Sequence, residues 1–214
     1  MKRSVIIWSA VMVLTALLGS TVDAAAQEVE DNTFGGWEFF EINHNFKNSN
    51  WFTTFYFEHD NYQYRRLECW YTRTTVGYKL TKWLKADVCY DFMHKPVADS
   101  HRALFDITGT LKEGNLSVQL RERDVHSWTP ELGEQGNVFR SRLKTQYAIP
   151  GTKFKPYLAM EVFTWGDTWK KTRHYVATTY EINEHFQIEG YYLYYTFAGM
   201  PAEHVLAIGL NMDF

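Results

Sequence analysis

The feature that most constrains the fold of this chain is a regular alternation of apolar residues with polar or small ones. In the last segment Leu206, Ile208 and Leu210 share one face of an extended chain, while Gly209 and Asn211 lie on the other. Successive side chains of a β-strand point to opposite faces of the sheet, so a period of two predicts β-strands. Helical periodicity is hard to find after the N-terminal region. We therefore expect an all-β protein.

Segments with this alternation follow one another along the chain, separated by Gly, Pro, Asn and Asp residues that favour turns. The predicted strands cover residues 34–46, 51–59, 67–79, 83–95, 101–113, 116–127, 137–149, 154–165, 170–182, 186–197 and 203–214. No linker or shift in composition divides them. Residues 27–214 are therefore expected to form a single domain.

The charged faces of these strands indicate an antiparallel up-and-down transmembrane β-barrel. In segment 137–149, Arg140, Arg142 and Lys144 share one face, and charges in such a row need water or polar partners. The mean hydropathy is −0.38, yet 17% of the residues are aromatic. A barrel that turns apolar residues to lipid and polar residues to its lumen accounts for both values. A soluble periplasmic β-domain is the alternative, because soluble antiparallel sheets also alternate.

Two further features favour the membrane barrel. Tryptophans cluster near the predicted turns, as in the aromatic girdles of membrane proteins. These tryptophans are Trp51, Trp83, Trp128, Trp165 and Trp169. The chain ends on Phe214 after alternating apolar positions, which resembles the C-terminal signature by which outer-membrane barrels are recognised for insertion. We therefore expect localisation to the outer membrane of a Gram-negative bacterium, with lipids and the barrel-assembly machinery as partners.

The first 26 residues have the pattern of a cleaved signal peptide. The basic pair Lys2-Arg3 precedes an apolar run over residues 5–18, and small residues lead to the alanines at 24–26. The run is shorter than the roughly 20 apolar residues of a membrane-spanning helix. We therefore expect residues 1–26 to direct export and to be removed, which leaves Gln27 as the first residue of the mature chain.

The direction of successive strands bears on their number. Short connections, which bacterial barrels keep in the periplasm, alternate with longer ones that are expected outside. The short connections are residues 113–115, 150–153 and 183–185, and the longer ones are 96–100, 128–136 and 198–202. With Phe214 in the periplasm, eleven strands would start the first strand outside, whereas such barrels usually have even strand numbers. We expect twelve strands, with residues 27–33 supplying a short one; ten strands are the alternative.

The two cysteines, Cys69 and Cys89, fall on the inward face of neighbouring predicted strands. A tight hairpin near residues 81–82 would place Cys89 opposite residues 73–75. Cys69 then lies some 13 to 20 Å further along, given the rise per residue of a strand. A disulfide needs Cα atoms within about 7 Å. We therefore predict two free thiols that face the lumen.

The inward-facing charges are the candidate functional residues. On the predicted register they lie on adjacent central strands and comprise Arg121, Arg123, Arg140, Arg142, Glu161, Arg173, Glu181 and Glu189. Guanidinium groups that line a pore would bind a small anionic solute. The favoured interpretation is structural, because side chains can fill much of the lumen of a small barrel with Arg–Glu pairs. Glu122 would face lipid unless it lies near the outer rim or a bulge shifts the register.

The sequence contains no recognisable catalytic, metal or cofactor motif. His126 and Ser127 are adjacent in a predicted strand, so their side chains point to opposite faces. A rim set of His59, Asp60, Asp91 and His94 would suit a hydrolase of surface lipid or peptide, which is the alternative function. The histidines lack metal-ligand spacing, and no glycine loop could cradle a phosphate. With a formal net charge of −3 and no basic block, nucleic acid is not an expected partner.

Several short motifs follow one another in a characteristic order. They are Trp37, Arg65-Arg66, Arg121-Glu122-Arg123, Arg140-Ser141-Arg142, Pro156-Tyr157, Glu161-Val162-Phe163, Arg173 and the aromatic run Tyr191–Tyr195. In this order they resemble a family of exported bacterial proteins, domain of unknown function 2490, over essentially the whole mature chain. The resemblance implies an outer-membrane barrel and supplies no activity. We therefore expect a barrel of unknown specific role, either a narrow pore or a largely plugged structural barrel.

Overall fold

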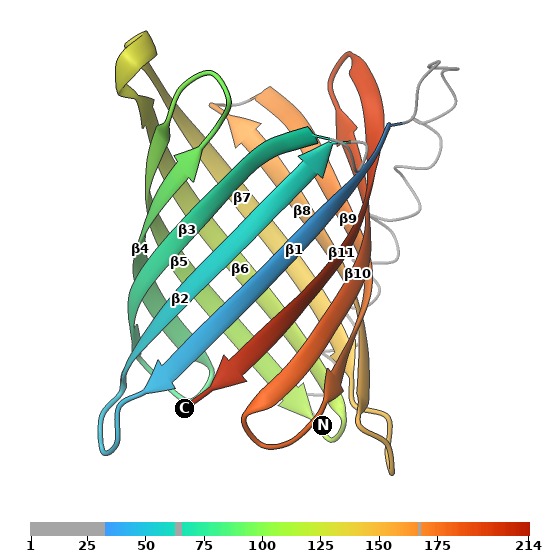
Figure 1. Ribbon diagram of the computed structural model, residues 1–214. Coiled ribbons are helices and arrows are strands. Elements are labelled where there is room, and N and C mark those ends of the chain that lie inside the picture. Colours follow the sequence, from blue (N-terminus) through green and yellow to red (C-terminus); the bar gives the residue numbers. More distant parts are fainter. Residues whose placement is uncertain (1–32, 63–65, 167) are drawn as a thin grey trace.

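The computed structural model describes residues 33–62, 66–166 and 168–214 (Figure 1). The predicted signal peptide at residues 1–26 lies outside these residues, as do residues 27–32 of the additional strand and Arg65 of the family motif. No helix in the described ranges is both long enough and apolar enough to cross a membrane.

The described residues form eleven β-strands and one short 3-10 helix. The strands are β1 (Thr33–Asn45), β2 (Trp51–Tyr62), β3 (Arg66–Lys79), β4 (Leu84–His94), β5 (Ser100–Glu113), β6 (Leu116–Thr129), β7 (Glu134–Tyr147), β8 (Phe154–Trp165), β9 (Thr168–Glu181), β10 (Phe186–Phe197) and β11 (Met200–Asp213). The helix η2 (Pro130–Leu132) connects β6 to β7. The predicted all-β fold is confirmed, and the eleven predicted segments correspond one to one with these strands.

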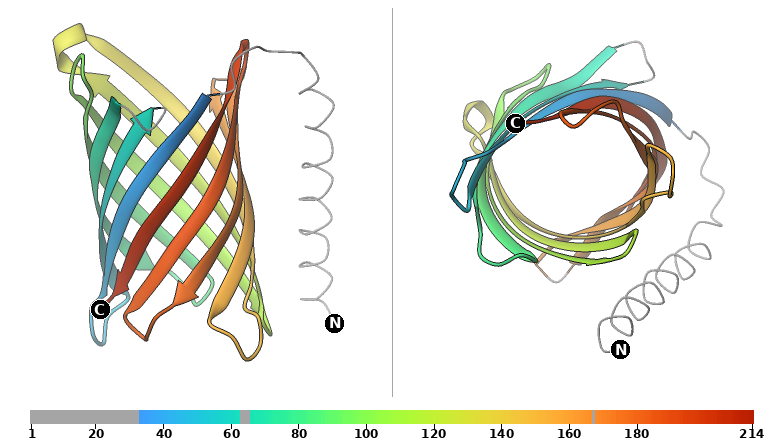
Figure 2. Two further views of the ribbon diagram at one scale, coloured as in Figure 1. Left: turned by 45° about the vertical axis from the view of Figure 1, so that its right-hand side comes forward. Right: turned by 90° about the horizontal axis from the view of Figure 1, so that it is seen from below.

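The strands form a closed barrel in which each pairs with its neighbours in the chain and β1 pairs with β11 (Figures 1 and 2). Consecutive strands are antiparallel, whereas β1 and β11 are parallel, with Gly35 beside Val205 and Asn43 beside Asp213. An odd number of up-and-down strands requires this arrangement, because the first and last strands run in the same direction.

The barrel therefore closes with eleven strands rather than the expected twelve or the alternative ten. The expectation rested on the preference of bacterial barrels for even numbers. Here the parallel pairing of β1 with β11 removes the need for another strand. One edge of β1 pairs with β2 and the other with β11, so the described strands close the barrel wall by themselves.

The expected difference in loop length between the two ends is not present in the described connections. At the end that holds Phe214, the strands are joined by residues 46–50, 80–83, 114–115, 148–153 and 182–185. Connections at the opposite end include 95–99, 130–133 and 198–199, which are no longer. Two of the stretches expected as long loops are partly strand, because β6 continues to Thr129, β7 starts at Glu134 and β11 starts at Met200.

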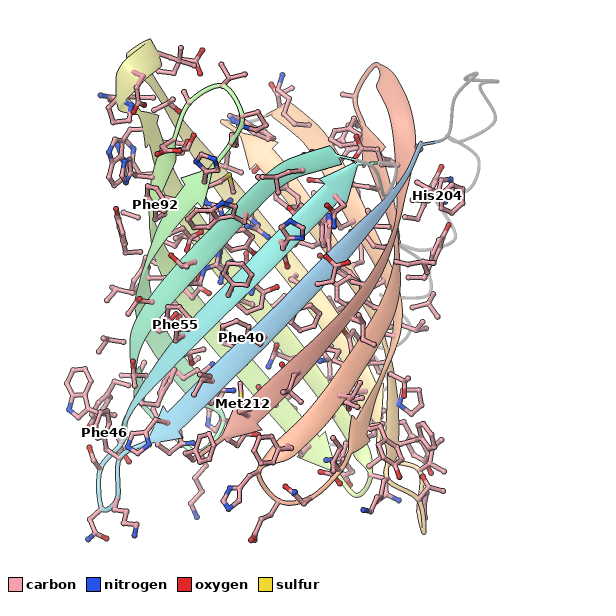
Figure 3. All side chains as sticks on the ribbon, in the orientation of Figure 1. Phe40, Phe46, Phe55, Phe92, His204 and Met212 are labelled. Carbon is pink, nitrogen blue, oxygen red and sulfur yellow. The ribbon has the colours of Figure 1, made fainter. Side chains whose placement is uncertain are left out.

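The outer face of the barrel is apolar along the middle of the strands. Val88, Val176 and Ile208 are 57%, 60% and 60% exposed. Phe40 and Phe55 lie side by side on the outside of β1 and β2, with their ring centroids 6.0 Å apart (Figure 3). Such a surface exceeds the scattered apolar residues that soluble proteins tolerate. Its polar counterpart lies inside the barrel.

All five predicted girdle tryptophans lie at or near strand ends. Trp51 and Trp83 are exposed at the end that holds Phe214, and Trp169 is exposed at the other end. Trp128 stacks on His101 there, with ring centroids 5.4 Å apart. Trp165, the last residue of β8, lines an interior cavity, as does Trp128. On β8, Trp165 belongs to the same alternating set of positions as Glu161, which also faces inward.

Candidate functional site

The lumen is packed most tightly near the middle of the strands. The largest fully buried side chains are Leu193, Glu161 and Asp91, from β10, β8 and β4. We call the ion pairs and stacked rings at this level the mid-barrel layer. It consists of an ionic half, Arg73, Asp91, Asp106, Arg121, Arg123, Arg140, Glu161 and Arg173, and an aromatic half, Phe39, Tyr56, Tyr71, Tyr175 and Tyr191.

Glu161 is the centre of the ionic half. Its carboxylate lies 2.6 Å from Nη2 of Arg121 and 3.0 Å from Nη2 of Arg140. Arg173 lies 3.9 Å away on the other side, and Tyr175 donates its hydroxyl at 3.4 Å. The register explains the approach of Arg173, because it is the direct cross-strand neighbour of Glu161. A carboxylate with 1% exposure needs such partners to remain charged.

Two bidentate ion pairs continue the ionic half around the barrel. Arg123 donates to both carboxylate oxygens of Asp106 at 2.6 and 2.5 Å, and the two residues are direct neighbours on β6 and β5. Arg73 on β3 binds Asp91 on β4 in the same way at 2.6 and 2.8 Å. Arg102 adds a second cation 2.7 Å from Asp91. This geometry is the strong fork-to-fork form of the Arg–carboxylate contact.

The aromatic half is a row of stacked rings on the other side of the lumen. Phe39 stacks on Tyr56 at 5.7 Å between centroids and on Tyr191 at 5.9 Å. Tyr71 follows Tyr56 at 5.6 Å, and Tyr175 follows Tyr191 at 5.5 Å. Contacts join the two halves at both ends. On one side Tyr175 binds the carboxylate of Glu161, and on the other the guanidinium of Arg73 lies 5.7 Å from the Tyr71 ring centroid.

Two cavities lie on opposite sides of the mid-barrel layer. The near cavity, towards the Phe214 end, has a volume of about 440 Å³, and the far cavity has about 620 Å³. Their linings have only Trp37, Arg140 and Arg173 in common. Of the mid-barrel layer, only Arg140 and Arg173 line both cavities.

The predicted site residues divide between the layer and its surroundings. Arg121, Arg123, Arg140, Glu161 and Arg173 belong to the mid-barrel layer. Arg142 and Glu189 line the near cavity, and Glu189 accepts hydrogen bonds from Tyr157 and from Asn211. Glu181 lies apart, near the end of β9, and pairs with Lys155.

Sequence reasoning missed the acidic partners on β4 and β5. Asp91 and Asp106 satisfy two of the arginines, and Arg73 and Arg102 join them. The signal was present for one pair: a short hairpin at residues 114–115 aligns β5 with β6 and places Asp106 directly opposite Arg123. For the other residues, the contacts depend on side-chain directions across the lumen, which alternation alone does not supply.

Neither explanation that the sequence suggested for Glu122, a position near the rim or a bulge, holds in the structure. It lies in the middle of β6, away from the rim, and the ladders of β6 with β5 and β7 contain no register shift. It therefore faces outward. Its carboxylate accepts a hydrogen bond at 2.5 Å from Ser141, its direct neighbour on β7.

Both predicted thiols are free and face the lumen, as expected. Cys69 lines the far cavity and Cys89 lines the near cavity. Cys89 is the direct neighbour of Thr75 on β3, within the expected range of opposite positions. The two thiols therefore lie in different compartments of the same lumen.

The rim set considered for hydrolysis does not assemble. Asp91 is fully buried in the lumen, whereas His94 binds Asp99 at 2.7 Å. His59 binds Glu38 at 3.1 Å, and Asp60 accepts a hydrogen bond from Cys69. These four residues thus take separate partners.

The adjacent pair His126-Ser127 also separates. His126 binds Asn137 at 2.7 Å, and the hydroxyl of Ser127 donates to the carbonyl oxygen of Gly136. Among the described residues, one group, Asp87, Cys89 and Asp106, has its ligand atoms within 4.8 Å of one another, as a metal site would require. Arg123 already binds Asp106, so a cation there would compete with that ion pair.

A comparison with protein-family models identifies the family of this chain. A family model described as protein of unknown function DUF2490 matches residues 34–202. The chain belongs to the DUF2490 family. The resemblance inferred from the order of its motifs is confirmed. No curated protein matches this DUF2490 protein.

Solved structures share the fold of the DUF2490 barrel. The structure titled NanC porin is 12% identical, with a TM-score of 0.52, and the match covers 76% of this chain and 81% of that one. The structure titled KdgM porin is 14% identical, with a TM-score of 0.48 and coverage of 73% and 81%. At this level of identity the likeness to the NanC porin concerns the barrel fold alone.

Proposed function

We propose that this DUF2490 protein is an outer-membrane β-barrel whose lumen is closed at rest by the mid-barrel layer. The observation that carries the proposal is the packing of ion pairs and stacked rings in the mid-barrel layer, with only Trp37, Arg140 and Arg173 common to the linings of both cavities. Arg–carboxylate pairs and stacked rings occupy the level at which an open pore would hold water. The protein thus presents two compartments to the two sides of the membrane.

Membrane insertion is supported by the exposed apolar face and by the porin fold of a solved structure. The C-terminal residue also fits this role. The backbone of Phe214 is held to β1, with its N–H donating to Asn43 at 2.8 Å and its carbonyl oxygen accepting from Asn45 at 2.9 Å. The phenylalanine side chain is exposed, which leaves it accessible to the barrel-assembly machinery.

Conductance in planar bilayers tests the closed lumen. The wild-type protein is expected to insert without the discrete current steps of an open pore. Trp37→Ala combined with Arg173→Ala removes two of the three residues common to both cavities and is expected to produce such steps. Gln187→Ala is the matched control, because Gln187 lines only the near cavity. Steps of equal size in the wild type and in the double variant would refute the proposal.

Folding of each variant is verified by the heat-dependent shift in gel mobility that distinguishes folded barrels from unfolded chains. Recovery of the wild-type protein in the outer-membrane fraction tests its location. Recovery in the soluble periplasmic fraction would instead support a periplasmic β-domain.

A further inference from the structure

The near cavity carries opposite charges on opposite walls. Arg142 and Lys144 project into it from β7, and Glu41 and Glu189 project from β1 and β10. In the strand order of the closed barrel, β7 lies across the lumen from β1, with β10 on the same side as β1 (Figure 2). The two cations and the two carboxylates therefore face each other across this compartment.

These four charges are not neutralised by one another. Within the described part of the chain, none of the four takes part in an ion pair within 4.0 Å. This sets them apart from the mid-barrel layer, where every carboxylate has an arginine partner. The near cavity thus holds four charged side chains without an ion-pair partner, next to a layer in which each carboxylate is paired.

Neutral groups hold the cationic wall in place. Arg142 donates to the side-chain oxygen of Gln119 at 3.3 Å, and its buried Nε has no hydrogen-bond partner. The ammonium group of Lys144 lies 3.7 Å from the ring centroid of Tyr157. Both cations retain donors that can turn to a ligand.

The acidic wall is arranged in the same way. Glu41 accepts a hydrogen bond from the side-chain amide of Asn43 at 2.9 Å. Glu189 accepts from the hydroxyl of Tyr157 and from the side-chain amide of Asn211. Tyr157 therefore lies between the two walls, since its ring contacts Lys144 and its hydroxyl binds Glu189.

We propose that the near cavity is a binding site for a small zwitterion with a free carboxylate and a free ammonium group, such as an amino acid or a short peptide. The carboxylate binds Arg142 and Lys144, and the ammonium group binds Glu41 and Glu189. A simple anion would bind the two cations on β7 but be repelled by the acidic wall. A simple cation would bind the acidic wall but be repelled by the cations on β7. A zwitterion satisfies both walls without adding net charge to a poorly solvated site.

The volume fits this class of ligand, because about 440 Å³ exceeds the size of a single amino acid and accommodates a short peptide. The inference rests on the proposed closed lumen only in that the mid-barrel layer forms the inner wall of the compartment. It does not require passage through the barrel. Its test is therefore independent of conductance.

Calorimetric titration of the full-length protein in detergent tests the site with three probes. Glycylglycine carries both charges, N-acetylglycylglycine lacks the ammonium group, and glycylglycinamide lacks the carboxylate. Saturable binding of one glycylglycine per chain is expected, and each blocked probe should bind at least about tenfold more weakly, since each loses charge-assisted hydrogen bonds. Glycine and triglycine then define the preferred separation of the charges.

Variants assign each wall to one end of the ligand. Lys144→Gln is expected to weaken glycylglycine about tenfold and to leave the residual affinity for glycylglycinamide unchanged. Glu189→Gln is expected to spare N-acetylglycylglycine in the same way. Lys155→Gln is the matched control, because Lys155 pairs with Glu181 outside the lining of the cavity.

Absence of saturable binding, equal affinity for the three probes, or an equal loss in Lys155→Gln would overturn the inference. A folded barrel that conducts ions but binds glycylglycine selectively would refute the closed lumen and retain the site. A non-conducting barrel without selective binding would retain the closed lumen and refute the site.

Discussion

The guanidinium group of Arg173, from β9, lies 5.0 Å from the ring centroid of Trp37, from β1. Both residues line the near cavity and the far cavity, so this cation–π contact lies at the boundary of the two compartments. A contact of this kind contributes more when it is shielded from water. It connects the ionic half of the mid-barrel layer with the wall on which the aromatic half lies.

Removing the central carboxylate should destabilise the barrel. Glu161→Gln leaves the guanidinium groups around it without a compensating charge, and breaking a buried ion pair from one side costs about 3–5 kcal/mol. Unfolding by urea or guanidinium chloride, followed by gel mobility, measures the loss. Glu181→Gln is the control, because its partly exposed pair with Lys155 contributes little, within about 1 kcal/mol. Equal stability of the two variants would show that Glu161 does not organise the layer.

The pair Arg123–Asp106 should behave as a coupled unit. Asp106→Leu alone leaves Arg123 buried and unpaired, whereas Arg123→Met with Asp106→Leu replaces both charges by apolar groups. The double variant should therefore be more stable than the sum of the single losses predicts, by at least about 1 kcal/mol. A double-mutant cycle of unfolding free energies measures this difference. Additive losses would mean that the bidentate contact contributes no coupling.

A glycine on β11 makes room for the aromatic half. A Cβ atom at Gly209 would overlap the ring of Phe39, so Gly209→Ala must displace a ring that stacks on two tyrosines. The expected loss is about 1–3 kcal/mol. Gly190→Ala is the matched control, since the nearest atom to its Cβ would lie 3.8 Å away. A loss in Gly190→Ala equal to that in Gly209→Ala would contradict this role of the glycine.

The exposed C-terminal ring should matter for assembly more than for stability. Phe214→Ala is expected to lower the amount of folded, heat-shiftable protein in the outer membrane severalfold, with little change once the protein is folded. Phe154→Ala removes another exposed ring at the same end of the barrel and should leave the yield near that of the wild type. Equal yields of both variants would count against recognition through Phe214.

The strands were predictable because alternation is a local property of the sequence. Every segment with a period of two became a strand, and the hairpin near residues 80–83 placed Cys89 opposite Thr75 as the sequence implied. The closure of the barrel was not predictable in this way. It depends on the pairing of β1 with β11, which join opposite ends of the chain and are connected by no turn.

The charged lumen was predictable only in part. Alternation identified the inward face of Arg121, Arg140 and Glu161, which meet in the structure. It also placed Glu181 in the same set, although this residue pairs with Lys155 at the end of β9. Height within the lumen follows from strand tilt and stagger, which are properties of the closed barrel rather than of any one strand.

Labelling of the two thiols from one side of the membrane tests the divided lumen most directly. In proteoliposomes of uniform orientation, a small charged methanethiosulfonate that cannot cross the bilayer is added to one side, and mass spectrometry locates the modified cysteine. From the Phe214 side, the mid-barrel layer predicts modification of Cys89 and protection of Cys69, with the reverse from the opposite side. Modification of both thiols from a single side at similar rates would show that the lumen is continuous and would contradict the closed barrel.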